Sequence, residues 1–128
     1  FVSQMLPAMG VAVEFYPQRV NAEIETYFKP ETTLIYVESP GSLTFEIQDL
    51  PAIVAAARHQ KVTANPITIM VDNTWGTALH YPVLSLGADV VVEAATKYIC
   101  GHSDISLGIA AASGAHGKAL RKTMRNLY

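Results

Sequence analysis

The stretch ITIMVDNTWGTALHYPVLSLGADVVVEAATK, residues 67–97, decides the fold class. It holds two short apolar runs, 67–71 and 90–92, whose β-branched residues predict buried strands. Residues 83–86 are predicted to form a short helix between the two runs, just before Gly87. A strand, a helix and a second strand in this order predict two neighbouring parallel strands.

The same alternation of strands and helices continues on both sides of this stretch. On the N-terminal side we expect a strand at 11–16, followed by a helix after Pro17. The apolar face of that helix would consist of Val20, Ile24, Tyr27 and Phe28. Next we expect a strand at 34–37 that is covered on both faces, and then a helix capped by Asp49. On the C-terminal side we expect a strand within 105–112 and a helix capped by Ser113, with Leu120, Thr123, Met124 and Leu127 on its inner face. The predicted fold is therefore α/β, a mostly parallel sheet with flanking helices.

The composition excludes several classes of partner. Half of the 128 residues are hydrophobic, 16% are charged and the net charge is −2, so the chain has no general attraction to nucleic acid or to acidic membranes. Four of its nine Lys and Arg residues lie within 118–125, which is typical of a solvated helix face. The histidines at 59, 80 and 116 lack metal-ligand spacing, so we expect no metal site.

The single cysteine and the apolar runs bear on the cellular compartment. Cys100 has no partner for an internal disulfide, which favours a reducing compartment. No signal peptide is visible, and no apolar run approaches the roughly 18 residues of a membrane helix. We therefore expect a soluble, cytoplasmic protein. Phe1 and Tyr128 both read as cuts within a longer protein.

Polar residues with possible chemistry follow the predicted strands directly. Asp72 and Lys97 are 25 residues apart, about one strand–helix–strand repeat, so two parallel strands could present an acid and an amine into one crevice. Taken singly, the acid is more often a turn former and the lysine a surface residue. As a pair they suit pyridoxal phosphate (PLP), which needs an amine for its aldehyde and an acid for its ring nitrogen.

Four motifs in order carry a resemblance to a known family. They are ESPGS at 38–42, VDNTW at 71–75, ATKY at 95–98 and GHSD at 101–104. The stretch 31–108 resembles the transsulfuration, or cysteine–methionine metabolism, family of fold-type I PLP enzymes. The resemblance implies that residues 1–128 are the central part of the large PLP-binding domain, without its N-terminal segment and without the C-terminal domain.

The resemblance also assigns roles to individual residues. Lys97 would be the catalytic lysine that carries PLP as a Schiff base and moves the substrate protons. Asp72 would pair with the ring nitrogen, Thr96 would donate its hydroxyl to the cofactor phosphate, and Ser39 would touch the cofactor. Ser39 is open to a second interpretation, because Ser-Pro is also an ordinary turn. Ala94 departs from the serine that many relatives use for the phosphate. Thr74 is expected to shape the turn after Asp72 rather than to react.

Two positions favour the β-lyase branch of the family. Trp75 and Ser42 stand where the γ-synthase and γ-lyase relatives more often have Phe and Asn. The implied reaction is α,β-elimination of a small amino-acid substrate, L-cystathionine, to homocysteine, pyruvate and ammonia, in a homotetramer built from dimers. The alternatives are a γ-lyase or γ-synthase activity, or an inactive truncated piece that serves only as an interaction module. A nucleotide-binding domain is disfavoured, because no Gly-rich turn joins a strand to a helix.

Overall fold

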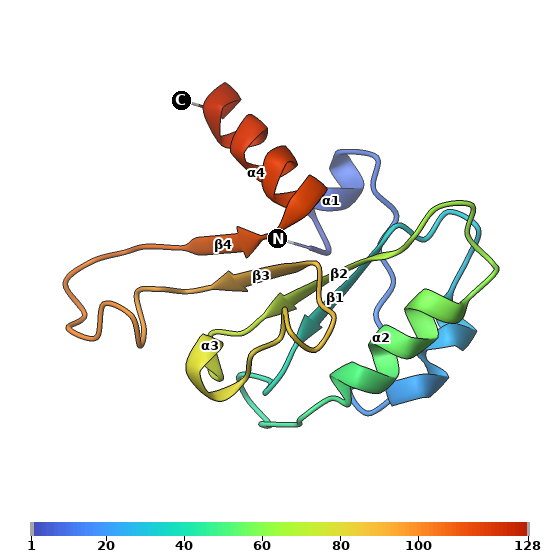
Figure 1. Ribbon diagram of the computed structural model, residues 1–128, viewed down its shortest axis with the longest axis horizontal. Coiled ribbons are helices and arrows are strands. Elements are labelled where there is room, and N and C mark those ends of the chain that lie inside the picture. The colour runs from blue at the N-terminus through green and yellow to red at the C-terminus, as the bar shows by residue number, and fades with distance from the viewer. Residues whose placement is uncertain (1, 128) are drawn as a thin grey trace.

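A four-stranded sheet forms the centre of the computed structural model, which describes residues 2–127. The strands are β1 (Leu34–Glu38), β2 (Thr68–Asp72), β3 (Val90–Glu93) and β4 (Ile109–Ala112), and they follow one another across the sheet in that order. β1, β2 and β3 are parallel, whereas β4 runs antiparallel to β3 (Figure 1). The predicted α/β class with a mostly parallel sheet is confirmed.

Helical segments lie before β1, between β1 and β3, and after β4. They are α1 (Met5–Ala8), the 3₁₀ helix η1 (Asn21–Tyr27), α2 (Leu50–His59), α3 (Thr77–His80) and α4 (Gly114–Leu127). The predicted cap of α2 is confirmed, because the carboxylate of Asp49 accepts a hydrogen bond from Ala52 N at 3.0 Å. No helix among residues 2–127 is long and apolar enough to cross a lipid bilayer.

Three of the predicted elements are wrong in extent or type. Residues 11–16 are irregular, because no strand lies beside them, and β-branched residues form a strand only where they can pair. Residues 83–86 form turns, since Pro82 and Gly87 leave too few residues to repay helix nucleation. The last strand begins at Ile109 instead of 105, because its pairing partner β3 ends at Glu93.

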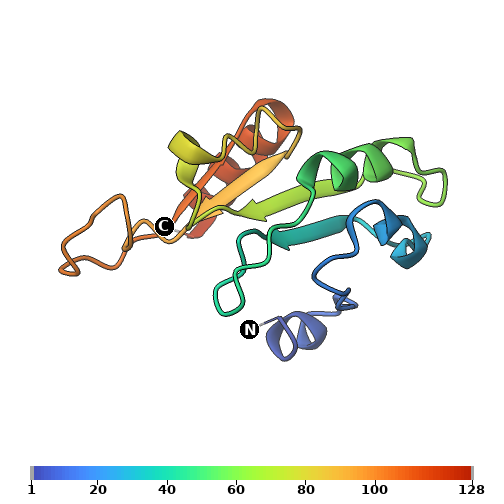
Figure 2. The ribbon, with the colours of Figure 1, turned by 90° about the horizontal axis from the view of Figure 1, so that it is seen from below.

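The apolar core lies on one face of the sheet. Ile35 and Val37 of β1 are buried there, together with Ile69 and Val71 of β2, against α2 and η1. Figure 2 shows α2 along this face of the sheet. The alternate residues Leu34 and Tyr36 are 45% and 44% exposed, so the expectation that 34–37 is covered on both faces is wrong. We call this second side the open face, since helices cover only the first within the described chain.

Helix α4 is anchored to the sheet mainly at its beginning. Gly117 is buried, and a Cβ atom there would lie 2.7 Å from the carbonyl oxygen of Ala112, so glycine allows the close approach. The predicted inner face is wrong beyond Leu120: Thr123, Met124 and Leu127 are exposed. Figure 1 shows the reason, because α4 rises from the end of β4 and leaves the sheet.

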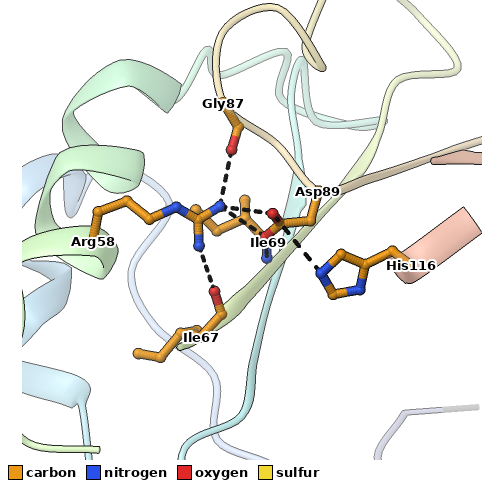
Figure 3. Close-up of polar contacts among 6 residues, drawn as sticks. All are labelled: Arg58, Ile67, Ile69, Gly87, Asp89 and His116. Atoms are coloured by element: carbon orange, nitrogen blue, oxygen red, sulfur yellow. Dashed lines mark hydrogen bonds and ion pairs between the residues drawn. The ribbon is translucent and has the colours of Figure 1, made fainter. Parts of the chain in front are cut away.

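One polar cluster joins α2 to the starts of β2 and β3 (Figure 3). Arg58, in the last turn of α2, donates to the carbonyl oxygens of Ile67 at 2.7 Å and Gly87 at 3.1 Å. Its Nη2 also lies 2.8 Å from both carboxylate oxygens of Asp89. Asp89 in turn accepts from Ile69 N at 2.7 Å, while Asp89 N donates to Ile69 O at 2.9 Å. We call these contacts the Arg58 clamp.

We expect Arg58→Met to lower the free energy of unfolding by about 2–3 kcal/mol, because it removes the partner of a part-buried carboxylate and of two carbonyl groups. Urea denaturation of the purified protein measures the change. Lys29→Met is the matched control: it removes the Lys29–Glu14 ion pair (2.6 Å), which is exposed, and should cost no more than about 1 kcal/mol. Equal losses in the two variants would contradict the structural role of the clamp.

Candidate functional site

The carboxyl ends of three parallel strands meet at one edge of the sheet, where ligands bind in folds of this class. Glu38 at the end of β1 pairs in register with Asp72 at the end of β2, which pairs with Val92 of β3. The chain leaves β3 at Glu93 and reaches Lys97 four residues later. The structure therefore brings Asp72 and the Lys97 loop to the same edge, as the sequence predicts.

The two oxygens of the Asp72 carboxylate have different partners. Oδ1 accepts hydrogen bonds from Thr74 N at 3.0 Å and from Thr74 Oγ1 at 2.7 Å. Oδ2 lies 3.4 Å from the phenol oxygen of Tyr36, which projects from β1. The turn after β2 thus holds one oxygen tightly, and the neighbouring strand contacts the other.

Thr74 also connects this carboxylate to the lysine loop. Its hydroxyl accepts a hydrogen bond from Ala94 N at 2.8 Å while donating its own hydrogen to Asp72. The sequence predicts only that Thr74 shapes the turn, and the structure adds this second contact. The acid and the loop that carries the amine are therefore linked through one hydroxyl group.

The backbone around Lys97 is a folded turn that leaves its side chain exposed. Lys97 N donates to Ala94 O at 2.9 Å, and Gly101 N donates to Lys97 O at 2.8 Å. Ala95 is fully buried and anchors the start of the turn. Within residues 2–127, the ammonium group of Lys97 has neither an ion pair nor a hydrogen bond to another side chain. The amine is thus open to a carbonyl group.

The two predicted hydroxyl ligands are both occupied by backbone groups. Thr96 Oγ1 donates to Leu107 O at 3.2 Å and accepts from Leu107 N at 2.8 Å. Ser39 is 1% exposed, and its hydroxyl accepts a hydrogen bond from Gln48 N at 3.0 Å. Thr96 would have to release Leu107 in order to bind a phosphate. The roles of Thr96 and Ser39 toward a cofactor stay predictions.

The edge is acidic, and its charges affect one another. Burial and the neighbouring Asp72 raise the pKa of Glu93 above its ordinary value. The carboxylate of Glu38 accepts hydrogen bonds from the backbone N and the hydroxyl of Ser42, which close the turn after β1. A cationic group placed beside Asp72 would relieve this concentration of negative charge.

Three aromatic rings that are far apart in the sequence form a row along the same edge. The rings of Phe45 and Trp75 are 5.2 Å apart with an interplanar angle of 84°, and those of Trp75 and Tyr98 are 6.2 Å apart at 58°. The only sequence signal is that each ring follows the end of a different strand. The rings of Trp75 and Tyr98 therefore contact other aromatic rings at this edge.

The residues at the edge fit the chemical needs of PLP. Asp72 has an oxygen on the open face that can accept a further hydrogen bond, as the protonated ring nitrogen requires. Lys97 offers a primary amine on the adjacent loop. Among residues 2–127, no group of three His, Cys, Asp or Glu side chains could hold a metal ion.

Comparisons with known proteins point to one family. The family model described as "Cys/Met metabolism PLP-dependent enzyme" matches residues 1–127. Cystathionine beta-lyase of Escherichia coli is 40% identical over 122 residues, which cover 95% of this chain and 30% of that protein. L-methionine gamma-lyase of Pseudomonas deceptionensis is 40% identical over 100 residues, or 78% of this chain and 24% of that protein.

A solved structure supports the same assignment. The crystal structure of metB from Corynebacterium glutamicum superposes with a TM-score of 0.89 at 27% sequence identity, over 98% of this chain and 32% of that chain. The chain therefore spans about a third or less of the proteins that it matches.

We expect Thr74→Ala to loosen the connection between Asp72 and the lysine loop. The free energy of unfolding should fall by about 1 kcal/mol, since one part-buried side-chain hydroxyl and its hydrogen bonds are lost. The amide of Ala94 should exchange its hydrogen faster, as NMR-detected exchange would report. Thr74→Ser keeps the hydroxyl and should retain the protection of Ala94; loss of protection in both variants would contradict the role of the hydroxyl.

Proposed function

The chain belongs to the Cys/Met metabolism family of PLP-dependent enzymes, and from that premise we propose that it is part of a carbon–sulfur lyase. We infer that its substrate is L-cystathionine and its reaction an α,β-elimination to homocysteine, pyruvate and ammonia. The observation that carries the proposal is the parallel pairing of β2 with β3, which brings Asp72 and the Lys97 loop to one edge.

In this proposal each residue has a defined task. PLP, when bound, supplies an electron sink that stabilises negative charge at the substrate α-carbon. Lys97 would hold the cofactor covalently through Nζ until the substrate amine takes its place. The freed amine of Lys97 would then take the proton from the α-carbon and deliver a proton to the leaving sulfur. Asp72 would hold the ring nitrogen in its protonated form. Thr96 would bind the cofactor phosphate, and Ser39 would contact the cofactor from the end of β1.

The similarity to cystathionine beta-lyases favours β-elimination, as do Trp75 and Ser42. A γ-lyase activity is the second candidate, because a methionine gamma-lyase is equally similar over a shorter stretch. We further propose that residues 1–128 form the central part of the PLP-binding domain of a cytoplasmic homotetramer built from dimers. Phe45, Trp75 and Tyr98 would line the same edge as the cofactor.

Lys97→Ala should abolish covalent attachment of the cofactor. Wild-type protein incubated with PLP and reduced with borohydride should carry the reduced cofactor on the peptide that contains Lys97, as mass spectrometry would show. Lys61→Ala, which removes another exposed lysine far along the chain, is the control and should leave the labelling intact. Labelling that persists in Lys97→Ala would refute the assignment of the lysine.

Product analysis separates the two elimination reactions. With L-cystathionine as substrate, the enzyme that contains this chain should release pyruvate, because the bond from the β-carbon to sulfur breaks. A γ-elimination would release 2-oxobutyrate and cysteine instead. Chromatography of the keto acids measures the ratio, and predominance of 2-oxobutyrate would replace the β-lyase proposal by the γ-lyase proposal.

A further inference from the structure

Tyr36 is a polar aromatic residue on the open face of the sheet that the proposed reaction does not yet use. It lies in β1 opposite Met70 of β2, two residues before Glu38, which pairs with Asp72. Residues two apart on a strand point to the same face, so Tyr36, Glu38 and Asp72 share the open face. The phenol of Tyr36 is therefore next to the Asp72 carboxylate on this face of the sheet.

The phenol oxygen of Tyr36 lies 3.4 Å from Oδ2 of Asp72. Oδ1 is already held by the backbone N and the hydroxyl of Thr74, at 3.0 and 2.7 Å. We propose that Tyr36 is a positioning residue, whose hydroxyl directs Oδ2 of Asp72 along the open face toward the ring nitrogen of the cofactor. This inference rests on the proposed function, since it assigns Tyr36 a role through Asp72.

The contact from Tyr36 limits the motion of the Asp72 carboxylate. The hydrogen bonds from Thr74 hold only Oδ1 of Asp72, so they leave the direction of Oδ2 less restricted. A donor from β1 restricts that direction, because β1 is paired with β2 along its whole length. The separation of 3.4 Å is longer than the roughly 2.7–2.8 Å of a tight O–H···O bond, and a carboxylate oxygen accepts more than one hydrogen. Oδ2 therefore keeps capacity for the ring nitrogen.

Burial and nearby negative charge both favour the protonated phenol, which is the form that donates a hydrogen bond. Burial first, and then the negative charge of Asp72, raise the pKa of Tyr36 to about 12, with a smaller contribution from Glu38. At neutral pH the hydroxyl thus remains protonated and can only donate to the carboxylate. A phenylalanine at this position would preserve the packing of the ring and remove this donor alone.

The first experiment compares Tyr36→Phe with Tyr27→Phe. Tyr27 lies in η1 and packs against the core on the opposite side of the sheet, so its variant controls for loss of a phenol hydroxyl. We expect Tyr36→Phe to weaken PLP binding by a factor of about 2 to 10, the worth of one hydrogen bond. The pH dependence of the absorption spectrum of bound PLP should shift as well, because that spectrum reports ring protonation. Tyr27→Phe should change neither quantity.

The second experiment does not need the cofactor. Near-ultraviolet titration follows tyrosine ionisation, and the difference between wild type and Tyr36→Phe isolates Tyr36 from Tyr16, whose pKa is also raised to about 12. In Asp72→Asn, the pKa of Tyr36 should fall, yet stay above its ordinary value of 10, because burial remains its largest cause. Tyr16 should titrate as before.

The outcomes separate failure of this inference from failure of the proposed function. If wild-type protein forms no borohydride-stable adduct at Lys97, the proposed function fails, and the role of Tyr36 fails with it. If the adduct forms, but Tyr36→Phe binds PLP with wild-type affinity and an unchanged spectrum, the positioning role alone is overturned. An unchanged pKa of Tyr36 in Asp72→Asn would also overturn it, because the contact between the two residues would then be absent.

Discussion

The register between β2 and β3 is the constraint on which the candidate site depends, and the Arg58 clamp holds it. Asp89 is bound through both its backbone and its side chain to Ile69, which places Val90 opposite Met70 and Val92 opposite Asp72. A shift of one residue would turn every side chain of a strand to the other face of the sheet. The hydrogen bonds between Asp89 and Ile69 at the amino edge therefore bear on which residues meet at the carboxyl edge.

At the carboxyl edge, the same register brings polar side chains of neighbouring strands into hydrogen-bonding contact. Tyr36 on β1 reaches Asp72 on β2, and Thr74 passes the connection on to Ala94 after β3. The contacts of Tyr36 with Asp72 and of Thr74 with Ala94 each join adjacent strands or the loops that follow them, so neither survives if one strand slides. Phe45, Trp75 and Tyr98 connect the same three loops through contacts between their rings, since each ring comes from a different loop.

The sequence predicts those parts of the fold that depend on hydrophobic pattern and helix capping within a short segment. The strands at 34–37, 67–71 and 90–92 and the cap at Asp49 are found close to where pattern and capping chemistry indicate. The strand expected at 11–16 fails because pairing needs a neighbour that a sequence window cannot reveal. Asp72 and Lys97 stand out through their motifs, whereas the contacts of Tyr36 and Thr74 emerge only once the register is known.

Lys97 and its neighbours on the loop after β3 are exposed to solvent. Covalent chemistry at a lysine benefits from a desolvated pocket, yet Lys97, Tyr98 and Ile99 are all exposed in the described chain. Exposed apolar side chains such as Tyr98 and Ile99 favour contact with another protein surface. Two of the similar proteins are about three times as long as the chain. A protein surface packed against this edge would bury these apolar residues and remove water from the amine, so one packing event would stabilise the edge and activate its chemistry.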